Sequence, residues 1–396
     1  MPADVSAALA EAKALVASLE AYDGSAAQHL TLLKQTDRVR SALEEPYDIG
    51  IRWLENMSAA AALYVLIHIG AFEKITAGDG VTAAELAKAS NVDVSIITRT
   101  MRILVANGIA VETGNDTYAS NVLSDVFQPP ALGSFVCVCV DFMRTWGAIP
   151  QYAKAHEPAD LYDIKKSPFA FAAGHEGKTY YDVISLDPKQ RNLWNITLQN
   201  MEKNFPIIDM FPFPSLKDQV EKEPERPFIV DVGGGRGQAL LAIKEHCGGT
   251  FGGKLILQDL PIVIDSLKPE DIPDIEPMTY DIFTPQPVKN AHVYLMRRLL
   301  HDFYNPVCVS ILSNTASAMG PDSRLLICDM LVPERVEVGG AVDLYWLDFS
   351  LLTISGKERT MEEFKDITDQ AGLEIVAVHP SGLGRTIMVE TRLKRE

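Results

Sequence analysis

Between Ile229 and Ile243 the sequence reads IVDVGGGRGQALLAI, and this stretch constrains the fold of the chain more than any other. The apolar run IVDV predicts a buried strand, and QALLAI carries apolar residues at the spacing of a helix. Four of the five residues from Gly233 to Gly237 are glycines. Glycine permits a tight turn with positive φ and a close approach of the backbone to a ligand. The stretch therefore predicts a strand-to-helix turn at the ligand-binding edge of an α/β sheet.

Seven short apolar runs extend from this region to the end of the chain, with helix-like segments between the first six. The runs are residues 227–232, 254–259, 277–283, 291–297, 324–331, 373–380 and 386–393. Strands that alternate with helices predict a parallel, doubly wound sheet. Only the segment SGLGR separates the last two runs, so we expect the final strand to be antiparallel to its neighbour. The sequence thus predicts six parallel strands and one antiparallel strand.

The N-terminal third has a different, mainly helical pattern. Residues 1–45 repeat alanine and leucine at helical spacing, as in an amphipathic helix that packs either on its own chain or on a second copy. Farther along, Thr82 and Glu85 form a capping box, and residues 91–106 predict a second strong helix. A hairpin around GND follows. Helix, helix and hairpin are the order of a winged helix, so we predict a winged-helix-like domain over residues 1–128.

Residues 129–396 form the second predicted domain. Its first part, residues 129–222, is mostly helical and rich in aromatic residues and methionines, which indicate either core or the wall of a substrate pocket. The charged segment KDQVEKEPERP, residues 217–227, has the composition of a solvated connector.

The charge of the chain limits its partners. Its 36 Lys and Arg residues stand against 53 Asp and Glu residues, and a net charge of -17 repels nucleic acids and anionic lipids. The second helix carries only Arg99 and Arg102 as basic residues, which favours association over DNA binding. Cys137 and Cys139 have no companion ligands in the sequence, so no metal is expected. The sequence has no signal-peptide pattern and no charge-free apolar window long enough to span a membrane. Its cysteines suit reduced thiols, so we predict a cytoplasmic protein.

Three aspartates stand at the ends of the first three runs of the sheet: Asp231, Asp259 and Asp281. A carboxylate after the second strand is suited to accept hydrogen bonds from ribose hydroxyls, and one after the third to bind an adenine amine. Each aspartate alone could instead be a helix cap or a surface acid. Gln238 breaks the dinucleotide pattern G-x-G-x-x-G, which weighs against a pyrophosphate ligand. Together these residues predict a nucleoside that carries a charged amino acid, as S-adenosylmethionine does.

The motifs DVGGGRGQ, LILQDLP, YDIF, RRLLHDF, LLICDMLVP and SGKERT resemble those of plant caffeate-type and fungal small-molecule O-methyltransferases. The resemblance is specific from about Pro227 onward and looser over the N-terminal half, where that family has a winged-helix-like dimerisation domain. It implies a class I methyltransferase fold with a Rossmann-like sheet, S-adenosylmethionine as cofactor and a homodimer. The implied cofactor contacts are Asp231, Gly233, Gly235, Asp259, Leu260, Asp281, Ile282 and Arg297. The implied acceptor contacts are Trp194, Met201, Asn204, Phe205 and Asp302.

Methyl transfer to a phenol needs a base, because a phenol with a pKa of about 10 is mostly protonated at neutral pH. His301 follows the fourth strand, at the same edge of the sheet as the glycine turn, and the resemblance makes it the base. Glu358 matches the family's glutamate, and Asp329 stands where plant members usually have glutamate. We expect both carboxylates to orient the imidazole and stabilise its charge. The shorter Asp329 leaves two alternatives: a water between it and His301, or a hydrogen bond made by Glu358 instead.

Glu358 also has a competing structural interpretation, because polar residues nearby manage the start of a helix. Thr360 and Glu363 form a capping box for the segment MEEFKDITDQAG. That box leaves Glu358 without a capping role.

The sequence therefore predicts an O-methyltransferase that acts on a phenolic or enolic hydroxyl of a small molecule, a secondary metabolite. The alternative on the same scaffold is a protein that binds the cofactor and promotes a pericyclic reaction without methyl transfer, as some fungal relatives do. Retention of both His301 and Glu358 favours methylation. A cofactor-sensing regulator would need a basic recognition surface, which the sequence lacks.

Overall fold

A computed structural model describes residues 4–202, 207–336, 340–382 and 386–394, except for the side chains of residues 199–202. Contacts divide the chain into two compact units. One comprises Met1–Ala148 and Tyr181–Asn204, and the other comprises Ile149–Tyr180 and Phe205–Glu396. Compactness does not test whether a segment folds alone, so the boundary between residues 128 and 129 stays a prediction.

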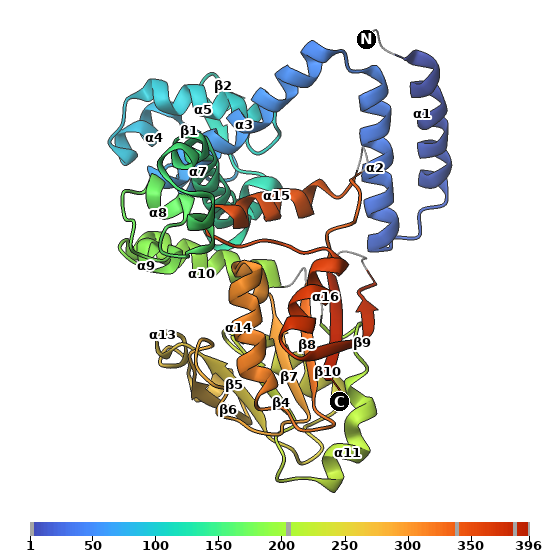
Figure 1. The fold of residues 1–396 in the computed structure, drawn as a ribbon. Helices are drawn as coiled ribbons and strands as arrows, with labels where there is room; N and C mark the ends of the chain where they lie inside the picture. The colour runs from blue at the N-terminus through green and yellow to red at the C-terminus, as the bar shows by residue number, and fades with distance from the viewer. Residues whose placement is uncertain (1–3, 203–206, 337–339, 383–385, 395–396) are drawn as a thin grey trace. The chain divides into compact units, whose positions relative to one another are not determined.

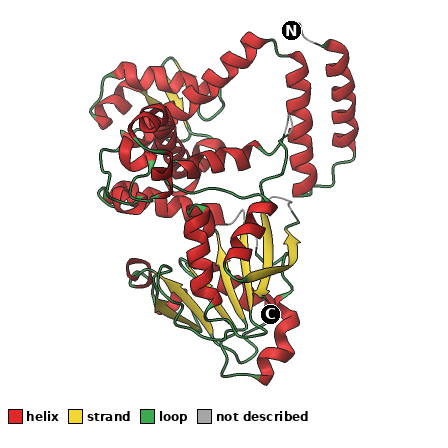
Figure 2. Ribbon diagram, viewed as in Figure 1, coloured by secondary structure: helices red, strands yellow, loops and turns green. Residues whose placement is uncertain are grey.

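The first unit is mainly helical (Figures 1 and 2). Its helices are α1 (Val5–Glu20), α2 (Ala26–Leu43), α3 (Pro46–His68), α4 (Ala83–Ser90), α5 (Val94–Ala106), α6 (Val122–Val126), most of α7 (Ser134–Ala155), most of α9 (Tyr180–Ile184) and α10 (Pro188–Glu202). The repeat predicted over residues 1–45 is two helices rather than one. Gly24, with a φ of 81°, and the N-cap Ser25 separate α1 from α2.

The predicted order of helix, helix and hairpin is present after α3. The Thr82 and Glu85 side chains form the predicted capping box of α4, and Asp93 caps α5. Strands β2 (Val111–Gly114) and β3 (Thr117–Ala119) form the hairpin, and β1 (Val81–Thr82) pairs with β3 to complete a three-stranded sheet. The core of the unit includes the fully or almost fully buried side chains of Leu63, Leu66, Phe72, Ile97, Met101 and Tyr118.

By length and composition, one region of the described chain, Pro129–Ala155 around α7, is long and apolar enough to cross a membrane. One such helix is weak evidence for a span, because core helices of soluble proteins pass the same test. Three charged residues, Asp141, Arg144 and Lys154, interrupt its apolar sequence. The Asp141 carboxylate accepts a hydrogen bond from the Tyr64 hydroxyl at 3.2 Å and pairs with Arg144 at 3.5 Å.

The second unit contains a seven-stranded sheet in the order β6-β5-β4-β7-β8-β10-β9 (Figures 1 and 2). Its strands are β4 (Ile229–Val232), β5 (Leu255–Asp259), β6 (Ile275–Thr279), β7 (Val293–Arg297), β8 (Arg324–Met330), β9 (Leu373–Pro380) and β10 (Thr386–Leu393). The four pairs among β4 to β8 are parallel, and β10 is antiparallel to both β8 and β9. The prediction of six parallel strands and one antiparallel strand is confirmed.

The helices of this unit are α8 (Pro168–Ala172), α11 (Lys217–Lys222), α12 (Gln238–Cys247), α13 (Pro261–Ile264), α14 (Asn305–Ala316), α15 (Val342–Leu352) and α16 (Met361–Gln370). Helices α14 and α16 pack on one face of the sheet, and α11 and α12 pack on the other. Ile311 of α14 and Phe364 of α16 belong to one apolar core, whereas Leu240 and Ile243 of α12 belong to the core on the other face. Alternate residues of each buried strand supply the two cores, as the period of a strand requires.

Two details of the sheet differ from the prediction. The third strand is Ile275–Thr279 rather than 277–283, because β6 pairs with all five residues of β5 from Leu255 onward. Residues 280–292, all of them described, connect β6 to β7 without a helix, although a helix-like segment was expected there. Apolar content in this connection reflects packing of Tyr280 and Val288 into the core.

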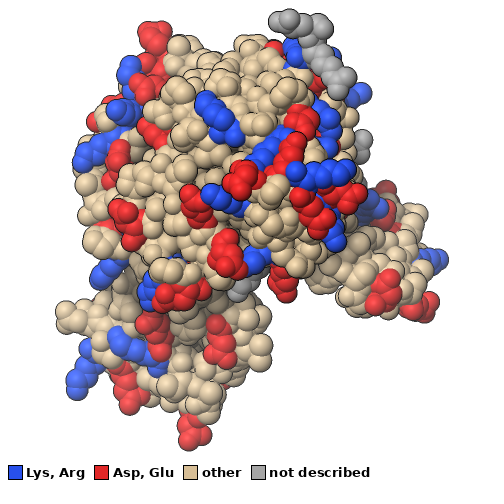
Figure 3. All heavy atoms as spheres, turned by 90° about the horizontal axis from the view of Figure 1, so that it is seen from below, with Lys and Arg blue, Asp and Glu red and all other residues tan. Residues whose placement is uncertain are grey.

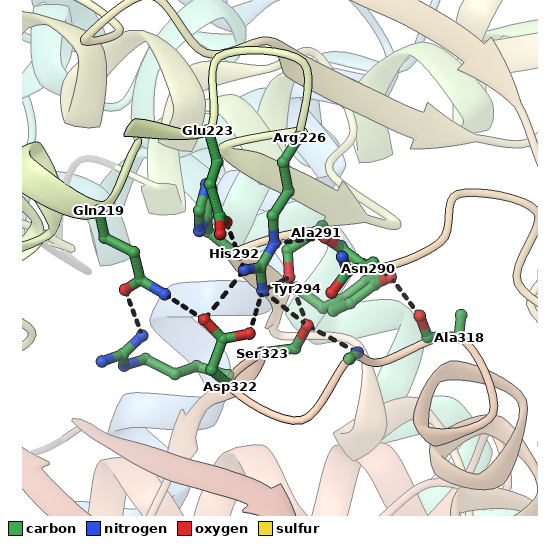
Figure 4. A network of polar contacts seen from close by, with 12 residues as sticks. Gln219, Glu223, Arg226, Asn290, Ala291, His292, Tyr294, Ala318, Asp322 and Ser323 are labelled. Atoms are coloured by element: carbon green, nitrogen blue, oxygen red, sulfur yellow. Dashed lines mark hydrogen bonds and ion pairs between the residues drawn. The ribbon is translucent and has the colours of Figure 1, made fainter. Parts of the chain in front are cut away.

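The segment predicted as a solvated connector, residues 217–227, is partly structural. It forms α11, and Val220 is fully buried. Arg226 is 9% exposed and anchors a polar network at the amino edge of the sheet, where the parallel strands begin (Figure 4). Its guanidinium pairs with Glu223 and Asp322, both at 2.8 Å. The charged composition therefore serves an ion-pair network there rather than solvation alone.

Figure 3 shows acidic and basic side chains interspersed over one face of the protein.

Candidate active site

The glycine turn after β4 depends on backbone conformations that favour glycine. Gly233, Gly235 and Gly237 have φ values of 71°, 60° and 82°. A Cβ on Gly234 would lie 2.4 Å from the Asp231 Oδ2 atom, so this position admits no side chain. A Cβ on Gly235 would meet nothing within 4 Å. Glycine at that position keeps the backbone of the turn accessible, as a ligand lying against it requires.

Asp231 and Asp259 lie at the carboxyl edge of the sheet, where the parallel strands end. Asp231 is fully buried near the end of β4, and Asp259 is the last residue of the neighbouring β5. The Asp259 carboxylate accepts hydrogen bonds from the backbone N–H groups of Gly235 at 2.8 Å and Leu260 at 2.7 Å. Burial raises the pKa of Asp259, and these two bonds oppose the shift. The carboxylate thus ties the end of β5 to the glycine turn.

Asp281 and Ile282 follow β6, which is the next strand in the sheet. The Asp281 carboxylate accepts a hydrogen bond from the backbone N–H of Phe283 at 3.0 Å, so it stabilises its own turn. The Ile282 carbonyl accepts one from the Asn314 side chain at 3.0 Å. The structural role considered for Asp281 is therefore present, and its contact with an adenine amine stays a prediction.

The three strands that carry these carboxylates are direct neighbours, in the order β6-β5-β4. Their ends form one edge, with the glycine turn at its centre. An open backbone turn flanked by carboxylates suits a ligand that has a ribose diol and amino groups, because each carboxylate oxygen accepts O–H or N–H donors. These residues fit S-adenosylmethionine.

Two arginines follow at the end of β7. Arg297 is the last residue of the strand, and Arg298 has a left-handed backbone with a φ of 51°. Burial lowers the pKa of Arg298, and the carboxylates of Glu358 and Asp329 oppose that shift. Arg297 was predicted from the sequence as a cofactor contact, whereas Arg298 in the same motif was not. No local pattern in the sequence indicates a role for Arg298, because the carboxylates that interact with it come from distant segments of the chain.

His301 lies in a 3₁₀ turn, Leu300–Asp302, directly after β7. It is 6% exposed. Its Nδ1 is 2.9 Å from the Glu358 Oε1 atom, and its Nε2 is 3.6 Å from Asp302 Oδ1. A carboxylate at Nδ1 favours the tautomer with the proton on that nitrogen, which gives Nε2 the lone pair that can accept a proton.

The pKa of His301 lies above its ordinary value. Burial lowers it, but the charge and hydrogen bond of Glu358, with smaller contributions from Asp302 and Asp329, outweigh burial. The site therefore strengthens the imidazole as a base and stabilises the imidazolium that forms when it takes a proton.

Asp329 lies in β8 and is 2% exposed. Among the described residues, neither of its carboxylate oxygens has a hydrogen-bond partner. Burial raises its pKa to about 7, against the opposing charge of His301. Glu358 makes the hydrogen bond to His301 that one of the two alternatives requires, and a water between Asp329 and His301 stays a prediction.

The segment from Gly356 to Thr360 holds Glu358 in place. The backbone N–H of Glu358 donates to Asp348 Oδ1 at 2.7 Å, and that of Lys357 donates to the His301 carbonyl at 2.8 Å. A Cβ on Gly356 would lie 2.4 Å from the same carbonyl, so the segment can approach His301 only with glycine there. The predicted capping box between Thr360 and Glu363 is present as well. Glu358 takes no part in it.

Of the residues predicted to contact the acceptor, Asp302 lies beside His301. Trp194 belongs to the first unit, where its ring packs edge-on against Phe142 and Tyr181. Met201 is in the last turn of α10, and its side chain lies outside the described residues, as do Asn204 and Phe205. These contacts stay predictions.

Within the part of the chain that the structure describes, no three His, Cys, Asp or Glu side chains are grouped as metal ligands. Burial raises the pKa of the Cys137 and Cys139 thiols to about 12, so both are protonated at neutral pH.

The profile of the O-methyltransferase domain family matches residues 168–374. O-methyltransferase hmp5 of Hypomyces subiculosus is 40% identical over 369 residues, which are 92% of this chain and 92% of hmp5. The structure of OxaC in complex with SAH and oxaline is 26% identical, with a TM-score of 0.85 over 99% of this chain and 100% of OxaC.

A structure described as a pericyclic reaction enzyme has the same fold, with a TM-score of 0.82 and 22% identity over 98% of this chain and 99% of its own. The family profile and the similarity to hmp5 agree with the glycine turn, the edge carboxylates and the buried histidine. The chain is therefore an enzyme of the S-adenosylmethionine-dependent O-methyltransferase family.

Proposed function

We propose that the acceptor is a phenolic or enolic hydroxyl of a small secondary metabolite, and that His301 removes its proton. The observation that carries this proposal is the 2.9 Å contact between His301 Nδ1 and Glu358 Oε1 in a buried setting. Oriented in this way, Nε2 accepts the hydroxyl proton while the carboxylate stabilises the resulting positive charge. Loss of this proton makes the acceptor oxygen more nucleophilic toward the methyl group that the bound cofactor would supply.

The glycine turn, Asp231 and Asp259 are the residues that would hold S-adenosylmethionine. When bound, this cofactor supplies an electrophilic methyl group on a sulfonium. The protein's own part is to orient the acceptor and to hold the proton at Nε2 of His301. Its buried environment limits solvation of the charges that develop.

The test is transfer of isotopically labelled methyl from S-adenosylmethionine to a panel of phenols and enolised 1,3-diketones. We expect the label to appear in at least one acceptor. The rate of methyl transfer should be about 10²- to 10⁴-fold lower for His301→Ala than for the native protein. Calorimetric titration of S-adenosylmethionine into both proteins checks that the variant still binds the cofactor. Equal rates for the two proteins would show that His301 is not the base.

The second candidate function is catalysis of a pericyclic reaction without methyl transfer. The observation in its favour is the shared fold with the pericyclic reaction enzyme, at an identity that supports the fold alone. The two functions give different products in one experiment. If no label is transferred but a polyene substrate cyclises, the second candidate replaces the first.

We propose in addition that the N-terminal region is a winged-helix-like dimerisation domain. Its first three helices expose large apolar side chains, including Leu9 (56%), Trp53 (61%) and Leu54 (60%). Among the described residues of α1 only Ala8 is buried, and in α2 none is. Apolar surface of this extent is typical of association. Sedimentation equilibrium should give a dimer for the native chain and a shift toward monomer for the double variant Trp53→Glu and Leu54→Glu.

A further inference from the structure

Among the residues that the structure describes, Arg359 is the largest fully buried side chain, with 1% of its surface exposed. A guanidinium has five N–H donors, and each of them has an acceptor here. Nε donates to Asn305 Oδ1 at 2.9 Å, Nη1 to the carbonyls of Leu300 at 2.9 Å and Lys357 at 3.3 Å, and Nη2 to the carbonyl of Phe303 and to Cys308 Sγ at 3.0 Å.

None of these acceptors is a charged group. Within the described residues, no carboxylate lies within ion-pair distance of Arg359, whereas the buried Arg226 pairs with both Glu223 and Asp322. Burial of a charge is costly, and an ion pair offsets part of that cost. An arginine held only by neutral acceptors is a poor device for stability, so its value lies in what it holds.

What it holds is the turn that carries the proposed base. Leu300 and Phe303 stand on either side of His301 and Asp302, so the guanidinium fixes both ends of the turn. The thiol of Cys308 reinforces this arrangement, since its single S–H is within reach of the Leu300 carbonyl at 3.2 Å and the Phe303 carbonyl at 3.5 Å and donates to one of them at a time.

The backbone of Arg359 is fixed independently of its side chain. It forms a parallel bridge with Leu331, and its carbonyl accepts from the backbone N–H of Val332 at 2.9 Å. The segment is thereby anchored to the chain that leaves β8. Because Glu358 precedes Arg359 directly, the same anchored segment presents a carboxylate to the His301 ring and a guanidinium to the Leu300 and Phe303 carbonyls that flank the turn.

We propose that Arg359 is a positioning residue, which holds the His301 turn in register with Glu358. Its planar fork bonds two carbonyls of that turn, which a lysine ammonium cannot reproduce with the same geometry. This inference rests on the proposed role of His301 in the reaction, but the contact that it concerns can be measured without the reaction.

The first experiment measures the contact by NMR in protein labelled at its eight histidines, with His301→Gln used to assign the His301 signal. Arg359→Lys keeps the charge and loses the fork. We expect the titration midpoint of His301 to move to lower pH and the low-field proton at Nδ1 to be lost. The matched control is Arg226→Lys, at the other edge of the sheet, which should leave both signals unchanged.

The second experiment measures kinetics with an acceptor from the labelled-methyl panel. Misplacement of a catalytic group by about 1 Å costs about 10²-fold, so kcat of Arg359→Lys should fall by about 10- to 100-fold. The affinity for S-adenosylmethionine, measured by calorimetry, should change by less than about twofold, because the glycine turn is untouched. In the double variant Arg359→Lys and Glu358→Gln, the losses in kcat of the two single variants should not multiply. Both substitutions disturb the same contact between Glu358 and His301.

An unchanged His301 midpoint and low-field proton in folded Arg359→Lys would overturn the inference. If Arg359→Lys does not fold, Asn305→Ala replaces it in the NMR experiment, because it removes one acceptor of the guanidinium. We expect Asn305→Ala to move the titration midpoint of His301 to lower pH, by less than loss of the whole fork would. Failure of the proposed function is distinguishable. In that case His301→Ala retains its rate of methyl transfer, and the NMR result still decides whether Arg359 positions His301.

Discussion

The two edges of the seven-stranded sheet treat buried charge in opposite ways. At the amino edge, Arg226 has two carboxylate partners and further bonds to Asn290 and Ser323 (Figure 4). At the carboxyl edge, neither oxygen of the buried Asp329 has a hydrogen-bond partner among the described residues. The amino edge thus satisfies the charge of Arg226 within the protein, whereas the carboxyl edge leaves the Asp329 carboxyl without a hydrogen bond among the described residues.

This difference separates stability from function. Buried polar groups normally find partners, and an exception costs free energy of folding. Exceptions persist where the unsatisfied group serves the reaction. The carboxyl edge is also the edge at which ligands of open α/β sheets bind. The unsatisfied edge is therefore the functional one, and the satisfied edge closes the sheet.

The largest effect should follow from a change at the functional edge. Glu358→Gln removes the charge that raises the pKa of His301, so that pKa should fall. We expect a loss of about 10- to 100-fold in kcat. The base works when deprotonated, so the acidic limb of the kcat/KM profile should move to lower pH. A profile with an unmoved limb would contradict this account of the pair.

Arg226→Met tests the satisfied edge. Its carboxylate partners are about half exposed, and water solvates them when the arginine is lost. The loss of stability should come mainly from the backbone carbonyls of Asn290 and Ala291 and the Ser323 hydroxyl, which lose their hydrogen bonds to the arginine. We expect the free energy of unfolding to fall by about 2 kcal/mol. Denaturant titration measures it, with exposed Arg99→Met as the control. The pH profile of activity should not change, and a shift in it would remove the distinction between the edges.

Asp329→Asn measures what the unsatisfied carboxyl costs. The pKa of Asp329 is about 7 in the folded protein and 3.8 in its ordinary state, so the folded protein holds a proton that the unfolded chain releases. Wild-type stability therefore falls as pH rises from 3.8 through 7. The variant does not titrate, so its stability relative to wild type should increase over that range by about 1 kcal/mol or more. Parallel stability curves would refute this explanation.

The smallest effect concerns His292, the exception at the amino edge. It is fully buried, and neither ring nitrogen has a hydrogen-bond partner among the described residues. Burial lowers its pKa below 6.5, so the unfolded chain binds a proton more readily and stability falls as pH drops below that value. In His292→Leu this loss should be smaller. The exposed His246→Leu is the control, and an equal change in both variants would exclude His292 as the cause.

Much of the sheet could be predicted from sequence because its signals are local. Alternation of apolar runs with helices, and the short segment before β10, were enough for six parallel strands and one antiparallel strand. The third strand begins two residues and ends four residues before the predicted bounds, because its register is set by pairing with β5. The helix expected between β6 and β7 is absent from the described chain, since apolar residues there fill the core instead of forming a helix.

The site divides in the same way. His301, Glu358 and the glycine turn lie in the sequence motifs that resemble those of the O-methyltransferase family, so they could be predicted. Arg298 and Arg359 were missed, although both stand inside quoted motifs, because their significance depends on partners more than 25 residues away in the chain or on burial. The charge of Arg226 indicated solvent exposure, but its partners Glu223 and Asp322 allow it to be buried.

The sequence by itself determined the six parallel strands and one antiparallel strand of the sheet, the glycine turn and the types of residue at the ends of the strands, because these depend on periodicity and backbone freedom over a few neighbours. Only the tertiary structure decided that Glu358, rather than Asp329, bonds His301, and that Arg359 has only neutral acceptors. Burial and pairing between distant segments set these properties, and no local pattern records them.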